Sequence, residues 1–159
     1  MTQFDLAGRT ALVTGAGQNV GRGIARTLAA QGPTVLVNDV HPDRAGAVVE
    51  EIGATGGVAR AAVFDVTDLD SVMAVLDHVG PVDILVNNAG NGGSTAMTPQ
   101  RFVAMPPSAW DGPIRVNLYG VLHCCHVVVP GREPGSPSPV RWPWKWRGKV
   151  SPRTRSPSA

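Results

Sequence analysis

LVTGAGQNVGRGIA, residues 12–25, joins an apolar run to a helical pattern through a glycine-rich turn. Gly15 and Gly17 let the chain turn sharply and bring bare backbone close to a ligand. The helix beyond the turn presents amide donors and the positive end of its dipole, a combination that suits a pyrophosphate. Glycine-rich turns also occur where nothing binds, so it is the strand before the turn and the helix after it that favour nucleotide binding.

From residue 9 onward, short β-branched runs alternate with longer helical patterns, which predicts a parallel sheet with crossover helices. The runs TVLVN and VDILV are almost continuously apolar, as is typical of strands covered on both faces. We therefore expect an α/β fold, a Rossmann-like doubly wound parallel sheet. The predicted strands are 10–14, 34–39, 59–65 and 83–87, and the predicted helices are 20–31, 42–54, 69–79 and a stretch from about 107, with Pro113 near its start or at a kink.

Charge and composition divide the chain near residue 130. Residues 1–130 carry seven arginines and eleven acidic residues, a net charge of −4, whereas residues 131–159 carry +6. The second segment is rich in Pro, Ser and Trp and shows neither strand nor helix periodicity, so we expect it to be disordered. We expect one nucleotide-binding domain over 1–130 and a basic tail over 131–159.

The first residues, the apolar runs and the cysteines indicate where in the cell the protein is expected. The start of the chain carries no basic flank before a long apolar run, and no apolar stretch approaches the roughly 18 residues of a membrane span. Cys124 and Cys125 are the two cysteines, and their adjacency is unsuited to an ordinary disulfide framework. We expect a cytoplasmic protein without a membrane partner.

Two acidic residues end predicted strands. Asp39 follows Gly15 by 24 residues, where a carboxylate accepts hydrogen bonds from adenosine ribose hydroxyls and repels a 2′-phosphate, which favours NAD over NADP. Asp65 ends the third strand, where it can accept from the adenine amino group. The alternative for each is that it caps the helix that follows.

Five motifs now appear in order: TGAGQNVGRG, ND, FDV, DILVNNAG and VNLYGV. In this order and at these intervals they resemble the short-chain dehydrogenase/reductase family, from about residue 6 to residue 130. The resemblance implies a nucleotide-binding fold in which the glycine-rich turn cradles the pyrophosphate, the two aspartates bind adenosine, and the NNAG segment lines the ribose and nicotinamide side. The implied cofactor-binding residues are Gly15, Gly17, Gln18, Asn19, Val20, Gly21, Asp39, Asp65, Val66, Asn88, Ala89 and Gly90.

The chain departs from the family pattern at Asn19, where the family usually has glycine. Asn is the non-glycine residue that best tolerates a left-handed backbone, so we expect the loop to survive with at most weakened binding. Asn117 matches the family asparagine that helps hold a water in the proton relay. The family also uses a Ser and a Tyr-x-x-x-Lys pair, but the single tyrosine, Tyr119, has His123 four residues later.

HCCH, residues 123–126, places His123 and His126 one helical turn apart. Zinc normally takes four ligands from separated segments, and the sequence holds no other Cys/His cluster, so we interpret HCCH as a packed helix face rather than a metal site.

The tail WPWKW, residues 142–146, has three explanations: a membrane or nucleic-acid anchor, an unstructured linker, or translation out of frame. Reading the third base of each codon with the first two of the next permits tyrosine at the 153/154 junction, lysine at 157/158 and serine at 140/141. These positions have the spacing of the family's Ser, Tyr and Lys. We therefore favour a frameshift and expect no nucleic-acid partner.

The first functional hypothesis is an NAD-dependent short-chain oxidoreductase for an alcohol/ketone pair, present as a truncated and inactive copy after about four strands and the Asn117 helix. The family is usually homo-oligomeric, and the resemblance implies that this chain lacks part of that interface. The second hypothesis is a non-catalytic nucleotide-binding or interaction module with a cationic tail that binds membranes or nucleic acid. The third is that the chain scarcely folds, because the fourth strand leaves an apolar edge exposed.

Overall fold

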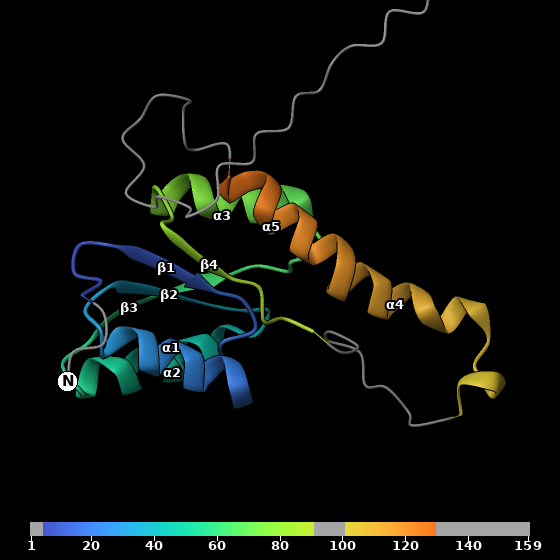
Figure 1. Ribbon diagram of the computed structural model, residues 1–159, viewed down its shortest axis with the longest axis horizontal. Helices are drawn as coiled ribbons and strands as arrows, with labels where there is room; N and C mark the ends of the chain where they lie inside the picture. The colour runs from blue at the N-terminus through green and yellow to red at the C-terminus, as the bar shows by residue number, and fades with distance from the viewer. Residues whose placement is uncertain (1–4, 91–100, 130–159) are drawn as a thin grey trace, which may run out of the picture.

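Four parallel strands form the centre of the molecule (Figure 1). The computed structural model describes residues 5–90 and 101–129. The strands are β1 (Thr10–Val13), β2 (Thr34–Asp39), β3 (Val58–Val63) and β4 (Ile84–Val86), in the order β3-β2-β1-β4. The chain builds outward from β1 to β3 and then returns to place β4 on the other side of β1. The carboxyl ends of β1 and β4 therefore flank a point where the winding direction reverses, which is where open parallel sheets bind ligands.

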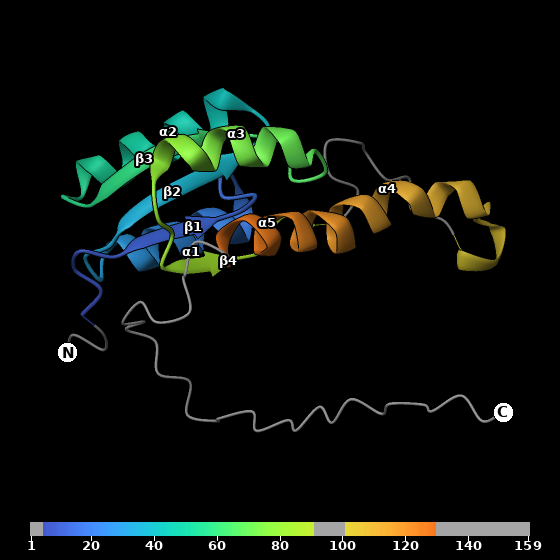
Figure 2. The same cartoon turned by 90° about the horizontal axis from the view of Figure 1, so that it is seen from above.

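Helices cover both faces of this sheet (Figure 1, Figure 2). Helices α1 (Asn19–Ala29) and α2 (Pro42–Ala54) lie on one face, and α3 (Leu69–Val79) and α5 (Gly120–Val128) lie on the other. This arrangement confirms the predicted doubly wound α/β fold. It also explains why the central strands are apolar on both sides, since each side is buried beneath helices.

Each face of the sheet has its own hydrophobic core. On the α1/α2 face, Val13, Val35 and Val37 pack with Ala25 and Ile52. The core on the α3/α5 face is formed by fully or almost fully buried residues from the strands, the helices and the segments that follow β3 and precede β4: Leu12, Leu36, Ala62, Phe64, Val66, Val72, Leu76, Val82, Val116 and Cys124. Alternate residues of one strand thus enter opposite cores, as the two-residue period of a strand requires.

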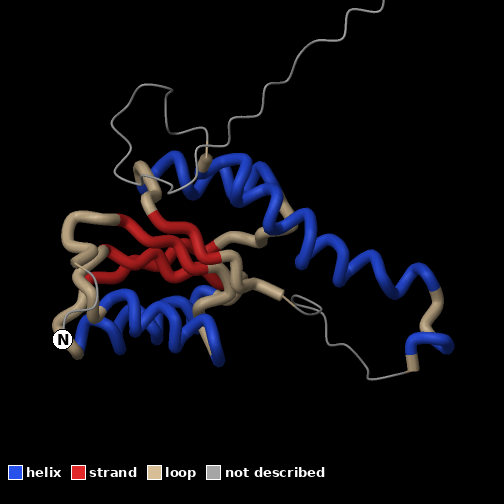
Figure 3. The backbone as a smooth tube through the Cα atoms, viewed as in Figure 1, coloured by secondary structure: helices blue, strands red, loops and turns tan. Residues whose placement is uncertain are grey.

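Helix α5 is the last part of a long, continuous helical rod (Figure 3). The short 3₁₀ turn η1 (Phe102–Ala104) comes before the rod. The rod itself consists of a second 3₁₀ turn, η2 (Pro107–Trp110), then α4 (Asp111–Ile114), the π-helical turn η3 (Arg115–Tyr119) and finally α5. Pro113 is the third residue of α4, so its missing amide donor falls in the first turn, as predicted near a helix start.

The predicted element boundaries agree with the structure to within one residue, except at two ends. The strand predicted over 59–65 ends at Val63, because Asp65 starts a turn in which its carbonyl accepts from the Asp68 amide (3.1 Å). The helix predicted to reach residue 31 ends at Ala29, and Gly32 follows with a φ of 95°, a conformation that few other residues adopt.

β4 forms one edge of the described sheet, and all three of its side chains are half-buried. In the described ranges 5–90 and 101–129, the helices are too short or too polar to cross a membrane. The predicted disordered tail, 131–159, lies outside the described residues.

Candidate functional site

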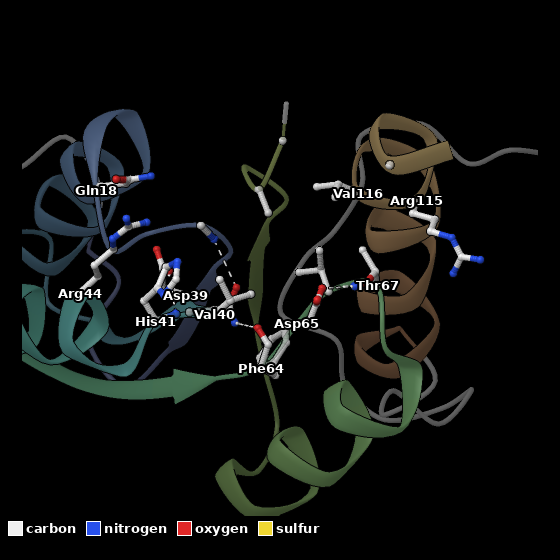
Figure 4. A pocket seen from close by; sticks show the side chains of 16 residues that line it. Gln18, Asp39, Val40, His41, Arg44, Phe64, Asp65, Thr67, Arg115 and Val116 are labelled. Atoms are coloured by element: carbon white, nitrogen blue, oxygen red, sulfur yellow. Dashed lines mark hydrogen bonds between the residues drawn. The ribbon is translucent and has the colours of Figure 1, made fainter. Parts of the chain in front are cut away.

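A pocket of about 250 Å³ opens at the carboxyl ends of the strands (Figure 4). One wall comes from the β1–α1 turn and the residues after β2, and the opposite wall comes from the rod that leads into α5. Its lining residues are Gly15, Gln18, Asn38, Asp39, Val40, His41, Arg44, Phe64, Asp65, Val66, Thr67, Ala89, Gly90, Gly112, Arg115 and Val116. The pocket thus brings together predicted residues from the glycine turn, both aspartate positions and the NNAG segment.

Thr14 and Asn88 join the two strand ends that flank the switch point. The Thr14 hydroxyl oxygen accepts from the backbone amides of Asn88 (2.9 Å) and Ala89 (3.0 Å). The Asn88 side-chain amide donates to the carbonyl oxygens of Thr14 (2.9 Å) and Gly15 (3.1 Å). Asn88 does not line the pocket, so its role here is to hold the glycine turn against the segment after β4.

Glycine is required where these segments meet. Gly15 has a φ of 61°, and a Cβ there would lie 3.0 Å from the Ala89 Cα. A Cβ on Gly21 would overlap the Gly15 carbonyl oxygen and lie 2.5 Å from the Asn88 Nδ2 atom. The first turn of α1 therefore packs directly on the backbone of the β1–α1 turn, which leaves the helix amides close to any group held there.

Asn19 has a φ of 48° and is the only non-glycine residue with a positive φ in the described part of the chain. The departure from glycine is thus accommodated in the left-handed conformation, as the sequence predicts. Val20 is 70% exposed and, like Gly17, Asn19 and Gly21, does not line the pocket, whereas Gln18 does. Gly17 nevertheless approaches the pocket wall, because a Cβ there would lie 2.5 Å from the Asp39 Oδ2 atom.

Asp39 and Asp65 both lie in the pocket wall and neither caps a helix. The Asp39 Oδ1 atom accepts from the His41 amide (2.9 Å), while His41 itself occupies the N-cap of α2. The Asp65 Oδ1 atom accepts from the Thr67 amide (2.8 Å). The cap of α3 is Asp68, whose carboxylate accepts from the Asp70 and Ser71 amides. The capping alternative is therefore wrong for both residues.

Asn38 is a site residue that sequence reasoning missed. It is 1% exposed, its Oδ1 atom accepts from the Gly15 amide (3.2 Å), and its Nδ2 atom donates to the carbonyls of Ala62 (2.9 Å) and Phe64 (3.0 Å). It thus ties the glycine turn to the end of β3. The sequence did carry a signal for this role, since Asn38 is the polar residue that ends the apolar run TVLVN. An amide buried at the end of such a run must be hydrogen-bonded. His41, Arg44, Thr67 and Arg115 were also missed.

Asn117 lies in the π-helical turn, and its side-chain amide donates to the Pro113 carbonyl (2.8 Å). A Cβ on Gly90 would lie 3.0 Å from the Asn117 Oδ1 atom, so this side chain faces the end of the NNAG segment. π-Turns often mark functional positions in helices. Val66, although it lines the pocket, belongs mainly to the core, and Gly120 of α5 packs tightly against it.

The HCCH residues point in different directions. The buried Cys124 belongs to the core, Cys125 contacts the Asn87 amide, and the His123 Nδ1 atom lies 2.9 Å from the Val66 carbonyl oxygen. Burial, with a smaller effect of neighbouring Cys125, raises the pKa of the Cys124 thiol to about 11. Within residues 5–90 and 101–129, no three His, Cys, Asp or Glu side chains gather in a way that would hold a metal ion.

The fold and this pocket define the class as a Rossmann-like α/β protein with its site at the switch point of a parallel sheet. The family model for short chain dehydrogenase matches residues 9–136, and the chain belongs to that family.

Among its relatives, the 7alpha-hydroxysteroid dehydrogenase of Escherichia coli K12 is 39% identical over 132 residues, covering 80% of this chain and 49% of the relative. A solved 7alpha-hydroxysteroid dehydrogenase complexed with NADH and 7-oxo glycochenodeoxycholic acid is 37% identical, with a TM-score of 0.72 over 82% of this chain and 50% of that one.

A gluconate 5-dehydrogenase from Burkholderia cenocepacia J2315, in complex with NADP and tartrate, is 36% identical, with a TM-score of 0.71 over 81% of this chain and 50% of that chain. The chain spans about half the length of the relatives that it matches. Solved relatives therefore include one with NADH and one with NADP.

Proposed function

We propose that this chain is the cofactor-binding part of an NAD-dependent oxidoreductase that interconverts an alcohol and a ketone. The observation that carries the proposal is that Asp39 and Gln18, the N-cap residue of α1, line one wall of the pocket, with the bare backbone of Gly17 packed against the Asp39 carboxylate. Family membership supplies the reaction class. When bound, a nicotinamide cofactor supplies the hydride acceptor or donor.

Each wall of the pocket has a distinct task in this proposal. The β1–α1 turn holds the pyrophosphate, because its glycines keep side chains away and the helix amides beyond it donate to anionic oxygens. Asp39 and Asp65 bind the adenosine portion. Ala89 and Gly90 line the nicotinamide side, with Asn117 beyond them. The narrow contact between Gly90 and Asn117 excludes a bulky side chain at this position.

NAD is the proposed cofactor because Asp39 places a carboxylate on the adenosine side. It is 6% exposed, and one of its two oxygens already accepts from the His41 amide. The remaining oxygen faces the β1–α1 turn, since it is the atom nearest to a Cβ built on Gly17. A ribose hydroxyl can donate to that oxygen, whereas a 2′-phosphate brings a second negative charge beside it.

We propose that these 159 residues bind the cofactor without turnover. Proton exchange with the substrate oxygen needs a group whose pKa suits the reaction. Tyr119 is the single tyrosine, and its ring stacks on His123 at a centroid distance of 6.4 Å. Lys145 and Lys149, the two lysines, have no tyrosine four residues before them. A small-molecule alcohol or ketone is the proposed substrate class of full-length members of the family, which the resemblance implies are usually homo-oligomeric.

The test is binding of NAD to the whole chain, measured by calorimetry and by thermal unfolding. At a concentration of 100 times the Kd, NAD should stabilise the folded state by about 2.7 kcal/mol. The variant Gly17→Ala should lose this response, because its Cβ would meet the Asp39 carboxylate. Gly46→Ala in α2 is the matched control, since a Cβ there meets nothing within 4 Å. A wild-type chain that unfolds cooperatively but ignores millimolar NAD and NADP would refute the proposal.

A further inference from the structure

We propose that His123 is a positioning residue for cofactor binding, which orients the Asp65 carboxylate through the Val66–Thr67 peptide. The inference rests on the proposed dinucleotide site, in which Asp65 accepts from the adenine amino group. It gives a role to a histidine of the HCCH segment, which lies on α5 and does not itself line the pocket. Removing this histidine should weaken the selection of adenine by a chain that still folds and still binds a dinucleotide.

One peptide unit connects His123 to Asp65. The His123 Nδ1 atom lies 2.9 Å from the Val66 carbonyl oxygen, and because a carbonyl only accepts, Nδ1 carries the proton. The amide of the same peptide unit belongs to Thr67 and donates to the Asp65 Oδ1 atom at 2.8 Å, a bond drawn in Figure 4. Both polar groups of this peptide are therefore held by side chains, one from α5 and one from the turn after β3.

Helix α5 holds His123 in place for this contact. Gly120 and His123 are three residues apart and lie on the same face of the helix. A Cβ on Gly120 would lie 2.6 Å from the Val66 Cγ2 atom, so the missing side chain lets the helix approach Val66 closely. The Tyr119 ring stacks on the half-buried His123 ring at a centroid distance of 6.4 Å, which restricts the orientation of the imidazole. The donor is thus pre-organised.

Asp65 depends on such support because its side chain is exposed. An exposed carboxylate populates several rotamers, and fixing one of them on binding costs free energy. Its Oδ1 atom is held by the Thr67 amide, and within the described residues its Oδ2 atom has no hydrogen-bond partner and is available to a ligand. A donor on the Val66 carbonyl strengthens the Thr67 amide as a donor, since hydrogen bonds in a chain polarise one another. His123 therefore lowers the cost of presenting Asp65 to adenine.

The experiment compares the Kd for NAD with the Kd for nicotinamide hypoxanthine dinucleotide, both measured by calorimetry. This analogue carries a carbonyl oxygen in place of the adenine amino group, so it offers Asp65 an acceptor instead of a donor. The wild type should bind NAD about 10-fold more tightly than the analogue. His123→Leu, which removes the donor and keeps a side chain of similar size, should reduce this ratio by about 3- to 5-fold. A purely structural role would weaken the binding of both ligands equally and leave the ratio unchanged.

The conservative variant is His123→Asn, because the Nδ2 atom of asparagine takes the position of the histidine Nδ1 atom and can donate to the Val66 carbonyl. It should keep the ratio within about 2-fold of the wild type. The matched control is His126→Leu, since His126 is exposed on the same helix and does not line the pocket. This control should also leave the ratio within about 2-fold.

A double variant tests whether His123 acts through Asp65. Asp65→Asn should abolish the preference for NAD, because the asparagine amide can donate to the carbonyl of the analogue. His123→Leu added to Asp65→Asn should change the ratio by less than about 2-fold, as expected when two residues serve one contact. Circular dichroism melting shows whether each variant folds. If His123→Leu does not fold, His123→Gln, which moves the donor to the position of the Nε2 atom, makes the same comparison.

The outcomes separate this inference from the proposed function. A ratio that falls in His123→Leu and is kept in His123→Asn and His126→Leu supports the inference. If His123→Leu keeps the full ratio, or if His126→Leu lowers it equally, the role of His123 is refuted while NAD binding by the wild type upholds the proposed function. If the wild type binds both dinucleotides equally, Asp65 does not bind the amino group and the inference fails alone. If the folded wild type binds neither, the proposed function and this inference both fail.

Discussion

Gly21→Ala provides a direct test of how the β1–α1 turn is built. Gly21 is the buried third residue of α1, and a Cβ there would overlap the Gly15 carbonyl oxygen and lie 2.5 Å from Asn88 Nδ2 and 2.9 Å from Ala16 Cα. Two of these contacts are backbone atoms, and the third is an amide held by two hydrogen bonds. The methyl group therefore enters only if α1 moves away from the turn.

The expected loss of stability in Gly21→Ala follows from the contacts that the added methyl group must displace. Overpacking a well-packed site costs about 1–3 kcal/mol. Displacing Asn88 from its two carbonyl partners costs about 1 kcal/mol for each hydrogen bond. The better helix propensity of alanine returns about 0.5–1 kcal/mol. We expect a net loss of about 2–4 kcal/mol in the free energy of unfolding, together with loss of the NAD-induced rise in Tm.

The matched control is Gly23→Ala, two residues along the same helix. Gly23 is exposed, and a Cβ there meets nothing within 4 Å, so this change should raise stability by about 0.5–1 kcal/mol and leave NAD binding intact. Urea unfolding followed by circular dichroism at 25 °C gives both free energies. Equal stabilities and equal NAD responses for the two variants would show that α1 does not pack on the turn as described.

Three further predictions test separate parts of the structure. Thr14→Val should lower the free energy of unfolding by about 2–4 kcal/mol, because two amides lose their acceptor, whereas Thr14→Ser should lose less than half as much; equal losses would contradict the assigned hydroxyl role. Asp68→Ala should cost about 1 kcal/mol of cap energy in urea unfolding, while Asp68→Asn, which keeps the acceptor, should cost clearly less. Because burial raises the pKa of the Cys124 thiol to about 11, the folded state favours the protonated thiol. This contribution to the free energy of unfolding is complete below about pH 9 and should be lost between pH 9 and 11, by up to about 3 kcal/mol. Cys124→Ala should abolish this pH dependence of stability, and Cys125→Ala should retain it.

Local signals explain why the order of elements was predictable from the sequence. The limits of the β2 strand, 34–39, and of helices 42–54 and 69–79 follow from β-branched runs, Pro42 at a helix start and regular apolar spacing, which act over a few residues. The positive φ of Asn19 was also foreseeable from its chemistry. The end of β3 at Val63 was not, because the Asp65 turn competes with a run that still appears extended in sequence.

The sequence by itself determined the succession of strands and helices, the glycine turn and the acidic residues at or just after the strand ends, because backbone propensity and side-chain period are local properties. Only the tertiary structure decided which of these residues meet. The return of β4 to the far side of β1 brings Asn88 onto Thr14, 74 residues away, and the packing of β2 beside β3 turns Asn38 into a buried clamp on the glycine turn. Such contacts depend on strand order and helix packing, which bring together residues whose local sequences do not indicate that they are in contact.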